Sequence, residues 1–227
     1  MGLPSGVHHL ALNTKNMKEQ IEFFTDVLGA ELKALYWMHG TNGVRHCFLR
    51  LDHESYVSFV QGPQTESEPV AEGKVKAQPG AMGHVAFSVA NMDEMMRLRD
   101  RIRDRGHIVL GPIDHGFCHS MYFGGPEGLA LEICVNTRKE IDERAWIDPE
   151  CVAVHGISPE ELERYKNPKS YQDKGGKVAQ PSADNQKYAT MFGPRTAQVA
   201  YLPEDELTKM MGGSEPPVKV GTKAAAE

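Results

Sequence analysis

The stretch Gly83-His84-Val85-Ala86-Phe87-Ser88-Val89 repeats an earlier stretch of the chain, His9-Leu10-Ala11-Leu12-Asn13. Shifting the numbering by 75 places His9 on His84 and also aligns the segments that follow. A repeat of this kind is a copied supersecondary unit, so it sets the architecture before any other feature. Each copy predicts a strand that carries one histidine, followed by a helix.

The two strands share an uneven alternation of side chains. Leu10 and Leu12 lie on one face of the first strand, and His9 lies on the other face among small residues. His84 occupies the same place on the second strand. We therefore expect one apolar face that packs on a helix and one face that forms the floor of a cavity.

Each strand is followed by a capped helix and then by three more strands. Asn16 with Glu19, and Asn91 with Glu94, have the spacing of a capping box. The pattern predicts further strands at 32–37, 44–51, 56–60, 107–110, 119–123 and 129–135, with a loop at 112–116. Both copies therefore read as βαβββ.

The predicted fold class is α+β, with two paired βαβββ modules that form a cleft and a largely irregular C-terminal arm. The modules span residues 5–61 and 82–135, joined by a surface linker at 62–81 that contains three prolines. The extension at 136–227 carries short helices, which we expect at 137–146 and 159–165. We expect this arm to wrap its own subunit or a partner subunit.

Composition excludes several classes of protein. The net charge is −6 and no basic block is present, so nucleic-acid binding has no electrostatic footprint. No apolar run approaches the length that crosses a membrane. The four cysteines show no Cys-x-x-Cys spacing, and the first residues do not resemble a secretory signal, so we expect reduced thiols and a cytoplasmic protein.

Glu132 is the most informative single residue. It lies in the middle of an apolar strand, Leu-Ala-Leu-Glu-Ile-Cys-Val, where a carboxylate is costly unless it is paired or binds a metal. A buried Glu paired with an Arg remains the alternative. With His9 and His84 on their small-residue faces, two imidazoles and one carboxylate make the ligand set typical of non-haem Fe(II) oxygen chemistry.

These features resemble the vicinal oxygen chelate superfamily, which includes glyoxalase I, bleomycin-resistance proteins and type I extradiol dioxygenases. The matching features are the two modules, the His-x-Ala strand openings and the motif Tyr122-Phe123-x-x-Pro126-x-Gly128-x-x-x-Glu132. The resemblance covers residues 5–135. It implies a divalent metal in a cleft lined by both sheets, with His9, His84 and Glu132 as its ligands.

Ser58 separates the branches of that superfamily. By repeat spacing and face parity, Ser58 is the first-copy counterpart of Glu132. Glyoxalase-like and epimerase-like members usually carry a fourth protein ligand there, commonly Glu. A site with three protein ligands keeps more positions for a bidentate substrate and O2, which favours a dioxygenase with Fe(II) that cleaves a catechol beside its two vicinal oxygens.

The resemblance also implies catalytic and substrate-binding positions. His115 or its rival His119 is the counterpart of an acid/base histidine, and Tyr122 lies ten residues before the Glu, as in ring-cleaving members. Alignment of the two copies directs three further side chains into the cleft with Ser58: His46, Phe48 and Arg50. Arg50 offers a planar fork for a substrate carboxylate, or pairs with a nearby acid.

Two other functions remain open. A metal-dependent lyase or isomerase would use Mn, Zn, Ni or Co and need no O2. A sequestration protein would hold no metal, with His9, His84 and Glu132 hydrogen-bonded to one another. All three readings expect a small-molecule ligand and a homodimer or higher homo-oligomer.

Overall fold

The computed structural model describes residues 6–38, 41–52, 55–63, 82–137, 141–170, 172, 175–182 and 199–211. Most of the predicted linker at 62–81 lies outside the described residues. No helix in the described ranges is both long and apolar enough to cross a membrane.

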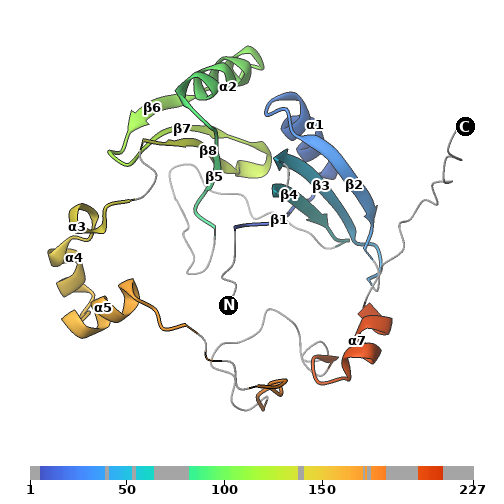
Figure 1. Cartoon of the computed structure of the whole chain (residues 1–227). Helices are drawn as coiled ribbons and strands as arrows, with labels where there is room; N and C mark the ends of the chain where they lie inside the picture. Colours follow the sequence, from blue (N-terminus) through green and yellow to red (C-terminus); the bar gives the residue numbers. More distant parts are fainter. Residues whose placement is uncertain are drawn as a thin grey trace, which may run out of the picture.

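The first module has the predicted order of elements. It consists of β1 (His9–Asn13), α1 (Met17–Asp26), β2 (Glu31–Trp37), β3 (Arg45–Asp52) and β4 (Ser55–Gln61). Its sheet has the order β1-β4-β3-β2, in which β1 and β4 are parallel and the other pairs are antiparallel (Figure 1).

The second module repeats this arrangement. It consists of β5 (Val85–Ser88), α2 (Met92–Asp104), β6 (Leu110–Asp114), β7 (Cys118–Gly124) and β8 (Ala130–Asn136), with the 3-10 turn η1 (Pro126–Gly128) before β8. Its sheet has the order β5-β8-β7-β6 with the same parallel and antiparallel pairs. The prediction of two βαβββ modules is therefore confirmed.

The capping residues act as predicted. The side chain of Asn16 accepts a hydrogen bond from the backbone N–H of Glu19, and Asn91 does the same for Glu94. Each bond satisfies one of the free N–H groups in the first turn of its helix. The helix starts are thus fixed by local sequence at equivalent positions of the two copies.

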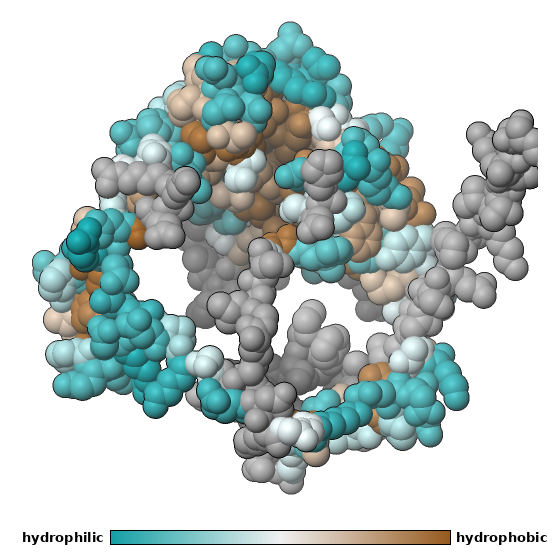
Figure 2. Space-filling view, viewed as in Figure 1, coloured by the Kyte–Doolittle hydropathy of each residue, from teal (hydrophilic) through white to brown (hydrophobic). Residues whose placement is uncertain are grey.

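One hydrophobic core serves both modules. Phe24 of α1 is fully buried, and its ring contacts Phe59 of β4 and Phe87 of β5, with ring centroids 5.2 and 6.2 Å apart. Figure 2 shows apolar surface gathered in the hollow between α1 and α2, whereas the outer surfaces of these helices are hydrophilic. Burial of one Phe side chain contributes about 1.5–3 kcal/mol to stability. Because Phe24 contacts strands of both modules, its burial also stabilises their association.

Strand β6 corrects the sequence prediction. A strand was expected at 107–110 and a loop at 112–116, but β6 spans Leu110–Asp114. Pro112 is accommodated because β6 is an edge strand, where a residue without an N–H removes no bond of the sheet interior. The register shifts between Leu110 and Ile113, which obscures the alternation that a regular strand would show.

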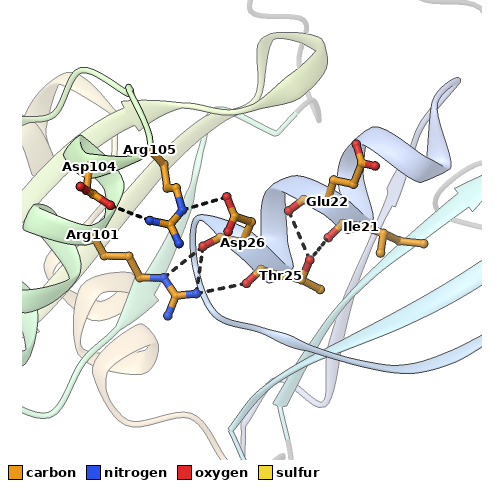
Figure 3. A network of polar contacts seen from close by, with 7 residues as sticks. All are labelled: Ile21, Glu22, Thr25, Asp26, Arg101, Asp104 and Arg105. Carbon is orange, nitrogen blue, oxygen red and sulfur yellow. Dashed lines mark hydrogen bonds and ion pairs between the residues drawn. The ribbon is translucent and has the colours of Figure 1, made fainter.

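Two arginines at the C-terminal end of α2, Arg101 within the helix and Arg105 at its C-cap, contact the end of α1 (Figure 3). Arg101 donates hydrogen bonds to the backbone carbonyls of Thr25 and Asp26, and Arg105 Nε donates to Asp26 Oδ2 at 2.9 Å. Positive charge beside the last carbonyls of a helix is favourable. Gly29, at φ +80°, gives Arg101 room, because a Cβ there would lie 2.7 Å from its Nη1.

Glu127 forms a second link between the modules. Its carboxylate accepts hydrogen bonds from Thr14 Oγ1 (2.5 Å), the Lys15 N–H (2.9 Å) and Gln20 Nε2 (3.0 Å). Its backbone lies in the left-handed region at φ +56°, which is uncommon for a residue other than glycine. Partial burial alone raises the pKa of Glu127, but these hydrogen bonds outweigh it and the pKa lies below its ordinary value.

We predict that Glu127→Gln destabilises the fold by about 1 kcal/mol at neutral pH, because a neutral amide accepts these bonds less strongly and the site is partly exposed. The lowered pKa means that the carboxylate stabilises the folded state above about pH 4.3 and that this contribution disappears as the pH falls further. Urea unfolding at pH 7 and pH 3.5 measures both effects. Glu22→Gln on the exposed side of α1 is the matched control, and equal losses in the two variants at pH 7 would contradict the prediction.

The C-terminal extension contains more helix than expected. Within the helix predicted at 137–146 the structure shows α3 (Glu143–Trp146), which Asp142 caps, while residues 138–140 lie outside the described residues. The second predicted helix is confirmed as α5 (Pro159–Lys166), with a complete capping box at Ser158. The sequence analysis missed α4 (Pro149–Val154) and α7 (Glu204–Met211). The pair Asp148-Pro149 could have predicted the start of α4, because Asp is a common N-cap residue and Pro is common at the first helical position.

The extension contacts the second module through Trp146. Its ring packs edge-on against Phe117, with centroids 4.9 Å apart, and covers Gly116, where a Cβ would lie 2.7 Å from the Trp ring. Beyond this contact α3, α4 and α5 bury no side chain of their own, and Figure 1 shows them on an arc that leaves the sheets.

Candidate metal centre

Strand register shows which side chains share the face opposite the core. In the second module Ala86 pairs with Glu132, and Glu132 pairs with Tyr122. In the first module Ala11 pairs with Ser58, and Ser58 pairs with Phe48. The structure thus confirms Ser58 as the counterpart of Glu132, and it makes Phe48 the counterpart of Tyr122.

His84 and Glu132 form the centre of the candidate site. His84 Nε2 lies 2.9 Å from Glu132 Oε2, and the side chains are 53% and 7% exposed. The buried carboxylate therefore has an imidazole as its partner, not the Arg that the alternative reading required. An imidazole nitrogen and a carboxylate oxygen side by side are suitable donors for a divalent cation such as Fe(II).

A second pair lies beside the first. His115 Nε2 and the Tyr122 hydroxyl are 2.9 Å apart, and the Tyr122 ring lies 6.3 Å from the His84 ring. The backbone N–H of His115 donates to the carbonyl of Cys118, which fixes the turn between β6 and β7. Of the two rival histidines, His115 is therefore the one that the structure joins to Tyr122.

His119 lies elsewhere. It pairs with Val135 in the β7–β8 register, and it alternates with Ser120 and Tyr122, so its side chain projects from the opposite face of β7. Its nearest acid is Asp114, at 4.0 Å. The structure therefore corrects the prediction that His119 shares the site, since strand alternation separates it from Tyr122.

His9 lies on β1, the equivalent strand of the first module. Its side chain is exposed, and its ring contacts Phe48 with centroids 5.3 Å apart. In the described part of the chain, no group of three His, Cys, Asp or Glu side chains is arranged to hold a metal ion. The structure brings two of the three expected ligands together and leaves His9 as a proposed third.

His8 is a residue that the sequence analysis missed. Its Nδ1 lies 2.9 Å from His9 Nδ1, so one ring donates to the other and His9 Nε2 is left to bind a ligand. Metal-binding histidines are commonly oriented by such a partner on the other ring nitrogen. The adjacent histidines His8 and His9 were the sequence signal for this contact. Strand alternation predicts that neighbouring residues face opposite sides, so it argued against a role for His8.

The substrate-binding candidates of the first module have different surroundings. Ser58 is fully buried and its hydroxyl donates to the Leu10 carbonyl at 3.3 Å. Arg50 pairs with Glu31 at 2.6 Å, so an acid of the neighbouring strand already holds its guanidinium. His46 and Phe48 lie ring against ring, with centroids 4.5 Å apart.

His46 is buried with an unsatisfied nitrogen. Its exposed fraction is 8%, and Tyr36 Oη lies 3.3 Å from its Nδ1. Among the residues that the structure describes, its Nε2 has no hydrogen-bond partner. Burial, with a smaller contribution from His9, lowers the pKa of His46, which keeps the ring neutral. A buried polar atom without a partner costs about 1–3 kcal/mol, which calls for a functional explanation.

Two thiols lie on the same sheet face as Glu132. Cys118 Sγ is 3.7 Å from Ser120 Oγ, and Cys134 pairs with Ser120 in the register. Burial, followed by the neighbouring Cys118, raises the pKa of Cys134. The Cys134 thiol is therefore protonated at neutral pH.

The chain belongs to the Glyoxalase/Bleomycin resistance protein/Dioxygenase superfamily, whose family model matches residues 6–133, more than half of the sequence. This result agrees with the duplicated module and with the resemblance found in the sequence.

Two curated relatives are dioxygenases of Rhodococcus globerulus. Biphenyl-2,3-diol 1,2-dioxygenase 2 is 26% identical over 137 residues, which cover 60% of this chain and 65% of the relative. Biphenyl-2,3-diol 1,2-dioxygenase 3 is 26% identical over 150 residues, which cover 65% and 69%. The chain thus spans about two thirds of the length of these relatives.

Solved structures with a similar fold include a glyoxylase/bleomycin resistance protein/dioxygenase domain from Frankia sp. EAN1pec, at 17% identity and a TM-score of 0.49. The match covers 58% of this chain and 98% of that one. The fosfomycin resistance protein FosX of Listeria monocytogenes, solved with Mn(II), matches at 18% identity and a TM-score of 0.43, covering 61% and 98%.

Proposed function

We propose that this protein is a metal-dependent dioxygenase that opens an aromatic ring beside a vicinal diol. The observation that carries the proposal is the placement of two polar pairs on one face of the second module: His84 with Glu132, and His115 with Tyr122. The dioxygenase names of the two curated relatives support it.

In this proposal His84 and Glu132, with His9, hold Fe(II), which supplies the redox chemistry when bound. His115 Nε2 and Tyr122 Oη share one proton along their hydrogen bond. Such a pair is suited to accept the proton of a substrate hydroxyl and to return it to the opened product, because histidine is the side chain that most often transfers protons in enzymes. The exposed faces of β1 and β5 leave access for the substrate.

The test is oxygen consumption by protein loaded anaerobically with Fe(II), measured with a panel of catechols. Cleavage beside the diol gives coloured ring-opened products that absorb in the visible range. Iron-loaded protein that neither consumes O2 nor changes any member of a broad panel would overturn the proposal.

A non-catalytic binding protein is the second candidate. The direct contact of His84 with Glu132 favours it, because two side chains that satisfy each other need no metal. Elemental analysis after gentle purification separates the candidates, since the binding protein predicts no bound metal. Turnover without O2, with Zn, Ni, Co or Mn, would instead indicate a lyase or isomerase.

We predict that His8→Ala weakens metal binding about 10- to 100-fold, because His9 loses the partner that orients its ring. The measurement is a competition titration with a chelator of known affinity. His155→Ala is the control, since His155 is an exposed histidine of the C-terminal extension whose Nδ1 lies 2.8 Å from the Cys151 carbonyl oxygen, away from the site. Unchanged affinity in His8→Ala would show that His8 does not orient a metal-binding ring.

We also propose a homodimer. The support is apolar surface on edge strand β2, where Leu35 is 52% and Trp37 is 65% exposed. Light scattering of the purified chain measures its mass directly, and a monomeric mass at micromolar concentration would contradict the proposal.

A further inference from the structure

The two modules present different chemistry at equivalent positions. Strand register matches Phe48 with Tyr122 and Ser58 with Glu132. The second module therefore carries the hydroxyl and the carboxylate, and the first module carries an aromatic ring and a small buried residue. This divergence suggests that one copy performs chemistry and that the other contributes recognition.

The aromatic side chains of the first module form a continuous surface. The rings of Tyr36 and Phe48 are nearly parallel, at 5° with centroids 6.5 Å apart, and Tyr56 meets Phe48 edge-on at 6.1 Å. His9 contacts the same Phe48 ring. These rings come from four neighbouring strands and are only partly buried, except for the exposed His9, so they offer a flat apolar area beside the third proposed ligand.

His46 adds one polar group to this surface. Tyr36 lies within hydrogen-bond distance of its Nδ1, whereas its Nε2 is buried with no partner in the described part of the chain. Which nitrogen carries the proton depends on the tautomer. If Tyr36 donates its proton, Nε2–H is an unused donor, and if Tyr36 accepts, Nε2 is an unused acceptor.

We propose that Tyr36, His46 and Phe48 form a subsite for a second, phenolic ring of the substrate, remote from the diol. The inference rests on the proposed function and names the substrate class of that site: bicyclic diols whose distal ring bears a hydroxyl. The distal ring packs on Phe48 and Tyr36, where aromatic pairs gain from offset or edge contacts. Its hydroxyl both donates and accepts, so it satisfies His46 Nε2 in either tautomer.

The test uses probes that cannot chelate a metal, so it does not depend on ring cleavage. Binding of 2-naphthol and of 2-methylnaphthalene to the full-length, metal-free chain is measured by fluorescence or calorimetry. The two probes differ by a hydroxyl in place of a methyl group. We expect 2-naphthol to bind about tenfold more tightly, the gain from one hydrogen bond to a buried partner.

Three variants assign this preference. His46→Phe keeps a planar ring but removes the nitrogen, and it should bind both probes equally. Phe48→Ala should weaken both probes by a similar factor, because both rings lose the same contact. His155→Phe, in the extension, should behave as the wild type.

A preference for 2-naphthol that survives in His46→Phe would overturn the subsite, as would wild-type protein that binds the two probes equally. If His46 controls 2-naphthol binding while no catechol is cleaved, the subsite stands and the proposed function fails. If catechols are cleaved while the two probes bind alike, the proposed function stands and the subsite fails.

Discussion

Glu132→Gln is expected to lose its metal and to lower kcat/KM for a catechol by about a thousandfold or more. A catalytic metal contributes several kcal/mol of transition-state stabilisation, and each 1.36 kcal/mol corresponds to a factor of ten. Glutamine keeps the shape of Glu132 and an oxygen that accepts from His84, so the fold should persist. Elemental analysis and steady-state kinetics on the same sample give both results.

Glu94→Gln is the control for this change, because Glu94 is a carboxylate in the first turn of α2 and has no part in the site. Thermal unfolding shows whether the Glu132 variant remains folded. Retention of one metal per chain by folded Glu132→Gln protein would exclude Glu132 as a ligand and with it the dioxygenase proposal.

Tyr122→Phe is expected to reduce kcat by about 10²- to 10⁴-fold while the metal content stays unchanged, because proton transfer by a positioned side chain contributes an effect of that size. His115→Gln should cause a similar loss, since the two groups are joined at 2.9 Å. The double variant should be no worse than either single variant, as expected when two residues act as a unit.

Metal content separates catalysis from structure, because neither His115 nor Tyr122 is a proposed ligand. Losses that multiply in the double variant, or loss of metal from either single variant, would show that the two residues do not act as one proton-transfer unit.

The duplicated architecture was readable because it depends on local signals. Asn16 and Asn91 cap helices that begin at the next residue. The alternation around His9 and His84 likewise involves only neighbouring residues of one strand. Edge strand β6 was misplaced because a register shift and Pro112 break the alternation on which the prediction relied. Glu127 and Arg101 form hydrogen bonds to residues that are far away in the sequence. A local sequence pattern therefore could not predict these contacts.

The candidate site was predictable in part for the same reason. Glu132 was found because a carboxylate in an apolar strand is costly, and the structure supplies His84 as its partner. The separation of His115 from His119 required the strand register, and the role of His8 required side-chain geometry. The position of His9 relative to the other two proposed ligands depends on how the modules pack, which strand patterns do not encode.

The contact between Trp146 and the turn at Gly116 and Phe117 has a consequence for the extension as a whole. His115 precedes that turn directly, so the first helix after the second module braces the same hairpin end that presents the imidazole to Tyr122. Enzymatic clipping near residue 140, or a gene fusion that displaces Trp146, would loosen this end of the hairpin. Trp146 thus supports the turn next to His115, and a truncation that removes this residue would disturb the proposed acid/base pair.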